Sequence, residues 1–315
     1  ISRCINNPKK VAEPTRVRIQ EAIETLVYMP HFVGRALARN RTTTIGAIIP
    51  TMDNAMFASG LQAFQETLSE AGVTLLVGSS NYDPAQEFEQ IHSLLSQGAD
   101  GLLLIGQARP KKTHDFLAQH SVPHVLAWCF PKSTCHHAVG FDNQKSGRAI
   151  AEHVISYGHR KLGVIAGLRD GNDRAQDRIL GIQDAINAHP NIQLLGLQEC
   201  KYSFDEAGSA LDDLLSGPVH PTAVICGSDV LAVGAMLRAR DLGFQIPEDI
   251  SITGFDDINL ARVTTPGLTT VRVPQHDMGR KAAHVLLGLL DADAPKPQSY
   301  ELMTTIIDRG TLARV

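Results

Sequence analysis

Short apolar runs alternate with stretches of helical periodicity along most of this chain, and this alternation restricts the fold more than any other feature. Ile45–Pro50, Val73–Gly78 and Gly101–Ile105 are nearly uninterrupted apolar segments, and the residues between them have helical spacing. Strands without polar alternation are typical of parallel sheets that helices cover on both faces. The sequence therefore predicts an α/β fold with a parallel sheet.

The same series starts a second time near Asp142. A helix is predicted at Gln144–Tyr157, a strand at Lys161–Ala166 and a helix at Asp177–Ala188, and the alternation continues to Ile250–Phe255. Two successive series predict two lobes, each a doubly wound parallel sheet. Because ligands of such sheets bind beyond the carboxyl ends of the strands, we expect a binding pocket in the cleft between the lobes.

The first 41 residues differ from the remainder in charge and in pattern. They contain eight Lys and Arg and three acidic residues, a net charge of +5, whereas the remainder carries −9. Glu13–Leu26 is predicted to be a helix with Pro14 in its first turn, and Phe32–Arg39 a helix too short to persist alone. A basic head on an acidic body favours contact with a polyanion. A solvated basic tail is the alternative that charge alone leaves open.

Several segments, taken together, resemble the LacI/GalR family of bacterial transcription regulators. The segments that carry the resemblance are Ser2–Pro8, Glu13–Glu24, Tyr28–Pro30, Arg39–Gly46, Gly158–Gly163, Arg178–Gly181, Gly254–Ile258 and Thr265–Arg272. They follow the family's order and spacing over nearly the whole chain, and the last two form the strongest match. The family's first helix and most of its recognition helix would precede Ile1, so the resemblance covers the helix-turn-helix only in part.

The resemblance implies a domain order and a function. Residues 1–29 would be a partial all-α helix-turn-helix headpiece, residues 30–43 a hinge helix, and residues 44–315 a core of the periplasmic-binding-protein type. Within the core, the first lobe would comprise 44–141 and 274–303, and the second 142–273 and 304–315. The chain is expected to be a sequence-specific DNA-binding regulator, most simply a repressor. A sugar or sugar acid bound between the lobes would control its affinity for operator DNA.

Five residues are the DNA-contact candidates that the resemblance implies: Ser2, Arg3, Asn6, Arg35 and Leu37. Arg3 matches the end of the recognition helix, where arginine can bond two acceptors of guanine. Leu37 matches the hinge leucine that wedges into the minor groove and kinks the duplex. Packing between two hinge helices of a dimer is a second role for Leu37, and the two roles are compatible.

Seven residues match family positions that line the effector cleft: Asn54, Phe57, Trp128, Arg178, Tyr202, Ser228 and Asp256. An arginine fork holds neighbouring hydroxyls or a carboxylate, and the aromatic rings offer flat faces to a sugar. Trp128 stands where sugar-binding members often carry aspartate. The loss of this acid, with Arg178 kept and Lys201 next to Tyr202, favours an anionic sugar acid. Asp229 is expected to cap the helix that begins there rather than to contact the ligand.

Other classes of protein find less support in the sequence. No glycine-rich nucleotide fingerprint and no catalytic triad stand out, so we expect neither an enzyme nor a cofactor. Cys129, Cys135, His136 and His137 lack the second ligand pair that a zinc site needs. The runner-up function is a solute-binding sensor of the periplasmic type without DNA binding, which the basic head disfavours. We expect a cytoplasmic protein, because the five cysteines are scattered and no export signal is visible. The lack of a long apolar run predicts no membrane segment, and the lack of a terminal heptad tail favours a homodimer.

Overall fold

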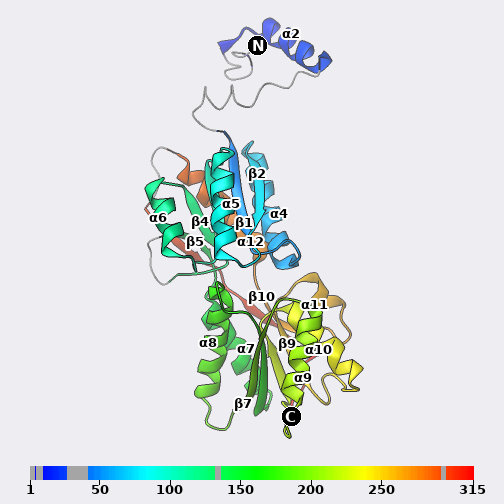
Figure 1. Cartoon of the computed structure of the whole chain (residues 1–315). Coiled ribbons are helices and arrows are strands. Elements are labelled where there is room, and N and C mark those ends of the chain that lie inside the picture. Colours follow the sequence, from blue (N-terminus) through cyan, green and yellow to red (C-terminus); the bar gives the residue numbers. More distant parts are fainter. Residues whose placement is uncertain (1–3, 5–9, 27–41, 132–135, 292–295) are drawn as a thin grey trace.

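The computed structural model of the protein describes residue 4 and residues 10–26, 42–131, 136–291 and 296–315. Most of these residues form two α/β lobes, each built on its own six-stranded sheet (Figure 1). The second series of strands therefore makes a separate sheet, and the predicted pair of doubly wound lobes is confirmed.

The first lobe contains a sheet in which every pairing is parallel. Its strands, in spatial order, are β11 (Ser299–Glu301), β5 (His137–Gly140), β4 (His124–Ala127), β3 (Gly101–Ile105), β1 (Thr44–Ile49) and β2 (Thr74–Ser79). Its helices are α4 (Ala55–Glu70), α5 (Pro84–Ser96), α6 (Lys111–Gln119) and α12 (Gln275–Leu289). Every residue of β1 and β3 is buried, as expected for central strands that helices cover on both faces.

The second lobe repeats this plan with one difference. Its strands, in spatial order, are β12 (Thr305–Ile307), β10 (Thr269–Arg272), β9 (Ser251–Asp256), β8 (Ala223–Cys226), β6 (Lys161–Gly167) and β7 (Gln193–Cys200). Its helices are α7 (Asn143–Ser156), α8 (Asp173–Asn187), α9 (Phe204–Leu215), α10 (Asp229–Asp241) and the short α11 (Asn259–Val263). Strand β12 lies antiparallel to β10 at the sheet edge, so this sheet is not wholly parallel.

Three segments carry the chain between the lobes: one after β5, one after β10, and one between β11 and β12. The second of these includes Val273 and Pro274 and returns the chain to the first lobe. There α12 packs closely against α4, with Gly279 against the backbone of Gly60. These crossings place the carboxyl ends of both sets of parallel strands on either side of one interlobe junction (Figure 1).

The basic head is described in part. Helix α2 (Glu13–Thr25) has a proline in its first turn, close to the predicted bounds, and buries none of its residues. The DNA-contact candidates Ser2, Arg3, Asn6, Arg35 and Leu37 lie outside the described residues, as does the predicted helix Phe32–Arg39.

Candidate effector site

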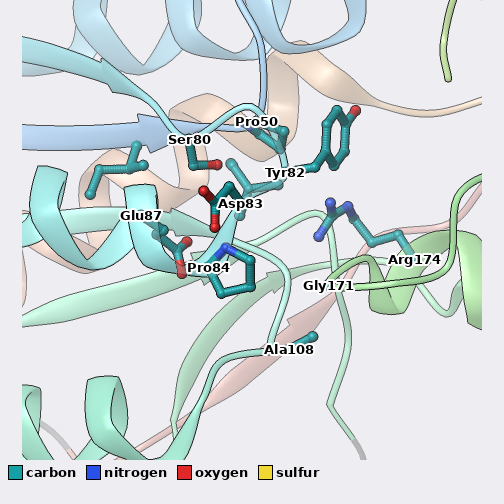
Figure 2. Close-up of a pocket in the computed structure, with 11 residues that line it drawn as sticks. Pro50, Ser80, Tyr82, Asp83, Pro84, Glu87, Ala108, Gly171 and Arg174 are labelled. Atoms are coloured by element: carbon teal, nitrogen blue, oxygen red, sulfur yellow. The ribbon is translucent and has the colours of Figure 1, made fainter.

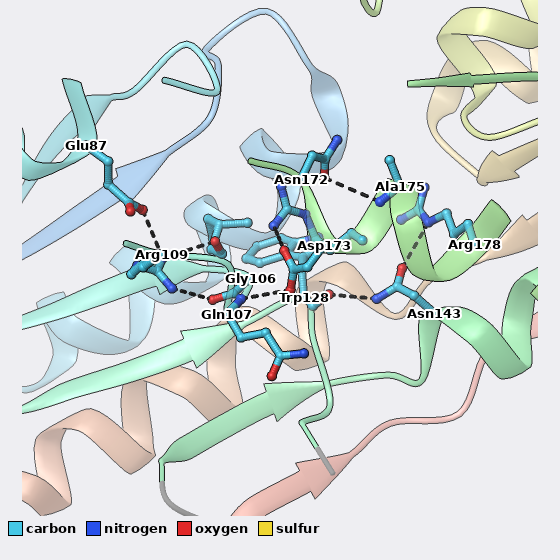
Figure 3. Close-up of polar contacts among 12 residues, drawn as sticks. Glu87, Gly106, Gln107, Arg109, Trp128, Asn143, Asn172, Asp173, Ala175 and Arg178 are labelled. Atoms are coloured by element: carbon cyan, nitrogen blue, oxygen red, sulfur yellow. Dashed lines mark hydrogen bonds and ion pairs between the residues drawn. The ribbon is translucent and has the colours of Figure 1, made fainter. Parts of the chain in front are cut away.

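Arg178 is a buried residue of the second lobe near its junction with the first (Figure 3). It projects from α8, is 5% exposed, and its guanidinium group lies 3.8 Å from the ring centre of Phe255. Its Nη1 lies 3.5 Å from a carboxylate oxygen of Asp256, which ends β9. The structure thus brings together the two residues that the family motifs place in the cleft.

A buried asparagine links Arg178 to the other lobe. The Nε of Arg178 donates to Oδ1 of Asn143 at 2.9 Å, and the Nδ2 of Asn143 donates to the carbonyl of Trp128 at 3.0 Å (Figure 3). Arg178 also donates from Nη1 to the carbonyl of Gly227 at 2.7 Å. Two of its five N–H groups therefore hold the guanidinium group in place, and the other three donate no hydrogen bond to the described residues.

Asp256 has an unusual environment for a carboxyl group. It is 2% exposed, and its Oδ1 accepts no hydrogen bond from the described residues, although Arg178 lies near enough for an ion pair. Burial raises the pKa of Asp256 to about 7, and the charge of Arg178 only partly opposes this. Its backbone φ of 116° lies in the region that favours glycine, and such strain is concentrated at functional sites.

Trp128 and Phe57 form the apolar wall of the site on the first lobe. Their rings meet edge to face with centres 5.5 Å apart, and each residue is 1% exposed. The indole Nε1 of Trp128 is buried and has no hydrogen-bond partner among the described residues. Buried polar atoms are almost always paired, so this donor and the acceptor on Asp256 are two atoms that a polar ligand would satisfy.

Asn54 and Ser228 serve as helix caps. Oδ1 of Asn54 accepts from the Met56 N–H at 3.0 Å, and Oγ of Ser228 accepts from the Leu231 N–H at 3.2 Å. The expectation that Asp229 caps α10 is therefore wrong. Asp229 is the first helical residue, and its carboxylate instead accepts from the Ile258 N–H and the Thr270 hydroxyl. Burial and the nearby Asp256 raise its pKa well above the usual value.

Tyr82 is a further candidate residue that the sequence analysis missed. It follows β2 in the first lobe, and its ring stacks on that of Tyr202 from the second lobe, with centres 5.5 Å apart. The hydroxyl of Tyr202 accepts from Asn172 at 3.1 Å. Burial raises the pKa of Tyr82, and its electrostatic interactions include Asp256 and Arg178. Its position at the end of a parallel strand is the sequence signal that could have identified it.

The lobes are closed over this site. Next to Tyr82, a cavity of about 20 Å³ lies between Ser80, Asp83 and Glu87 of the first lobe and Gly171 and Arg174 of the second (Figure 2). Ligand pockets for small molecules usually measure about 300–1,000 Å³. This cavity is therefore too small for a sugar, and a sugar-sized effector requires the lobes to separate.

The described residues contain no group of His, Cys, Asp or Glu arranged to hold a metal ion. Of the four residues weighed for zinc, Cys135 lies outside the described part. Cys129 is buried, and burial raises its thiol pKa to about 12. In the part of the chain that the structure describes, no helix is long and apolar enough to cross a membrane.

Comparisons with known proteins agree with this architecture. Residues 151–312 match the family model of a periplasmic binding protein-like domain. The HTH-type transcriptional repressor PurR of Klebsiella pneumoniae (strain 342) is 31% identical over 317 residues, which cover 99% of this chain and 92% of the repressor. The transcription regulator GntR from Chromobacterium violaceum has a similar crystal structure, with 30% identity and a TM-score of 0.80 over 85% of this chain and 99% of that one.

A further similar structure is the complex of the transcriptional regulator CelR with cellobiose. It is 25% identical, with a TM-score of 0.77, and covers 98% of this chain and 94% of that chain. A relative at 31% identity over nearly the full length establishes the family. The chain therefore belongs to the LacI family of DNA-binding transcriptional repressors, which are regulators and not enzymes.

Proposed function

We propose that this repressor binds a sugar or a sugar acid between its lobes, and that this effector controls its affinity for operator DNA. The observation that carries the proposal is the buried pair of Arg178 and Asp256, with a guanidinium group whose donors are only partly used. A planar arginine fork binds a carboxylate or two neighbouring hydroxyls, and Asp256 accepts a hydrogen bond from a hydroxyl group. The CelR–cellobiose complex supports a sugar as the ligand class.

We propose the following organisation for the protein. Residues 1–29 belong to the DNA-binding headpiece, residues 30–43 to the hinge and residues 44–315 to the effector core. The protein acts in the cytoplasm as a homodimer, because two headpieces bind the two half-sites of an operator. Effector binding changes the relative position of the lobes and so the spacing of the two hinges, which couples the pocket to DNA affinity.

The test begins with a thermal-shift screen of the full-length protein against neutral sugars and sugar acids. A ligand at about 100 times its Kd stabilises by about 2.7 kcal/mol, which such a screen detects. For a ligand that scores, Arg178→Ala should lose the shift and the change in operator affinity, yet bind operator as the parent does. The substitution leaves Asp256 buried without its partner, which can destabilise the fold. Circular dichroism therefore has to show that the variant is folded.

The matched control is Arg238→Ala. Arg238 also belongs to a second-lobe helix, α10, and it pairs with a carboxylate, that of Asp212 on α9, at 2.8 Å. Both side chains are partly exposed, and the pair joins two helices of the same lobe. This variant should keep the effector response. A normal response in folded Arg178→Ala would show that the site assignment is wrong, and loss of operator binding in both variants would point to a general folding defect.

A further inference from the structure

A second set of contacts joins the lobes and involves none of the seven predicted effector residues. Asp173 is the first residue of α8 in the second lobe, and its Oδ2 accepts the backbone N–H of Gln107 in the first lobe at 2.8 Å (Figure 3). Its Oδ1 pairs with Nη1 of Arg174 at 2.9 Å. A charged acceptor makes the stronger class of hydrogen bond, so this contact favours the closed arrangement of the lobes.

Gly106 in the first lobe leaves room for the carboxylate of Asp173. Gly106 has a φ of 73°, and a Cβ atom built there would overlap Nη1 of Arg174 and Oδ1 of Asp173. Glycine thus suits this position for two reasons, the positive φ of the backbone and the close approach of the Asp173 and Arg174 side chains.

The buried ion pair of Arg109 and Glu87 holds the loop that contains Gly106 and Gln107. Arg109 donates to the carbonyl of Gly106 at 2.6 Å and to that of Ile105 at 3.1 Å, and it pairs with Glu87 at 2.9 Å (Figure 3). The side chain of Arg109 is 1% exposed. The loop that carries the Gln107 N–H is therefore held in place before the lobes meet. Less conformational entropy is lost when the interlobe contact forms.

We propose that Asp173 is an interlobe latch, which holds this repressor closed without an effector and sets how much of the population can open. The latch acts through the lobe equilibrium and does not bind the effector. An effector that binds only one lobe arrangement binds more weakly overall when that arrangement is rarely populated. Its apparent affinity is reduced by the fraction of protein in that arrangement. The strength of the Asp173–Gln107 contact would therefore tune the sensitivity of the switch.

The proposal is tested on the ligand-free full-length protein by pulsed electron–electron spin resonance. Spin labels at Gln119→Cys and Asn187→Cys, exposed positions at the ends of α6 and α8, report the distance between the lobes. Cys4 and Cys135 are replaced by serine. Cys129, Cys200 and Cys226 are retained, because they are buried and their thiol pKa values are raised.

Asp173→Ala should shift the distance distribution away from that of the parent chain and broaden it. Asp205→Ala is the matched control, because it removes an acidic residue from the first turn of α9 on the same lobe. Both variants lose a similar interaction with a helix end. A distribution for Asp173→Ala that matches the parent and the control would overturn the latch.

A second pair of variants tests the latch from the first lobe. Gly106→Ala should shift the distances in the same way as Asp173→Ala, because its Cβ displaces the carboxylate of Asp173 from its contact with Gln107. Gly72→Ala is its control, since Gly72 has a φ of 70° in the same lobe with no atom within 4 Å of the added Cβ. If Gly72→Ala changes the distances as much as Gly106→Ala, backbone strain and not the interlobe contact is responsible, and the proposal fails.

Discussion

At the scale of single residues, Asp256 links the chemistry of the site to the stability of the fold. Its folded-state pKa is raised to about 7, whereas the carboxyl group of an unfolded chain has a pKa near 3.9. Below that lower value both states are protonated and its stabilising effect is fully present. As the pH rises towards 7 the unfolded state ionises first, so the free energy of unfolding falls.

Asp256→Asn should remove this loss, because the amide cannot ionise. Between pH 4.5 and pH 8 the parent chain should lose free energy of unfolding through this group, whereas the variant should not. The difference in stability between variant and parent should therefore grow by at most about 4 kcal/mol, at about 1.4 kcal/mol per pKa unit. Urea unfolding at the two pH values measures the difference. Asp53→Asn changes an exposed carboxyl group and should follow the parent; equal pH dependence in parent and Asp256→Asn would refute the assignment.

Residue roles were predictable from the sequence only where a motif fixed them. Arg178 and Asp256 came from family motifs, and the structure places them 3.5 Å apart. The roles of Ser228 and Asp229 could not be separated, because the cap is the residue with extended backbone, here Ser228 with a φ of −157°. Tyr82 follows a parallel strand, which is a local signal, but its contact with Tyr202 depends on the arrangement of the lobes, which no local pattern encodes.

At the scale of elements, the long strands were predictable and the short ones were not. Apolar runs such as β1 and β3 are buried throughout and have a clear pattern. Strands β11 and β12 have three residues each, partly exposed, and exist because they pair with β5 and β10. A segment that short has no periodicity to detect, so its structure is decided by its neighbours.

The packing of α12 on α4 gives an element-scale prediction. A Cβ at Gly279 would overlap the backbone of Gly60, so Gly279→Ala must push the helices apart and should cost at least about 1–3 kcal/mol of stability. Gly288 lies in the same helix with nothing near its added Cβ, and Gly288→Ala should be neutral or stabilising by up to about 1 kcal/mol. Chemical denaturation compares the two; similar effects would contradict the close crossing.

At the scale of the whole molecule, the sequence was enough to predict two lobes but not their relative position. The restart of the strand–helix series near Asp142 predicts a second sheet, and the structure contains it. Whether the lobes are apart or in contact depends on a few interlobe contacts, such as that of Asp173 with Gln107. Because such contacts are few, a ligand that binds one lobe arrangement better than the other can shift the balance between them.

In the proposed mechanism that change reaches the DNA through the hinge, which gives the last prediction. Leu37 lies outside the described residues, but its sequence places an apolar side chain between Arg35 and Arg39. We expect the arginines to neutralise phosphates and the leucine to unstack a base step. In a protein with a complete helix-turn-helix, Leu37→Ala should therefore weaken binding to operator at least tenfold more than binding to random duplex, because the lost wedge removes the bend and leaves the charge contacts. Titrations of both duplexes at matched salt measure this, and an equal loss on both would restrict Leu37 to packing between hinges.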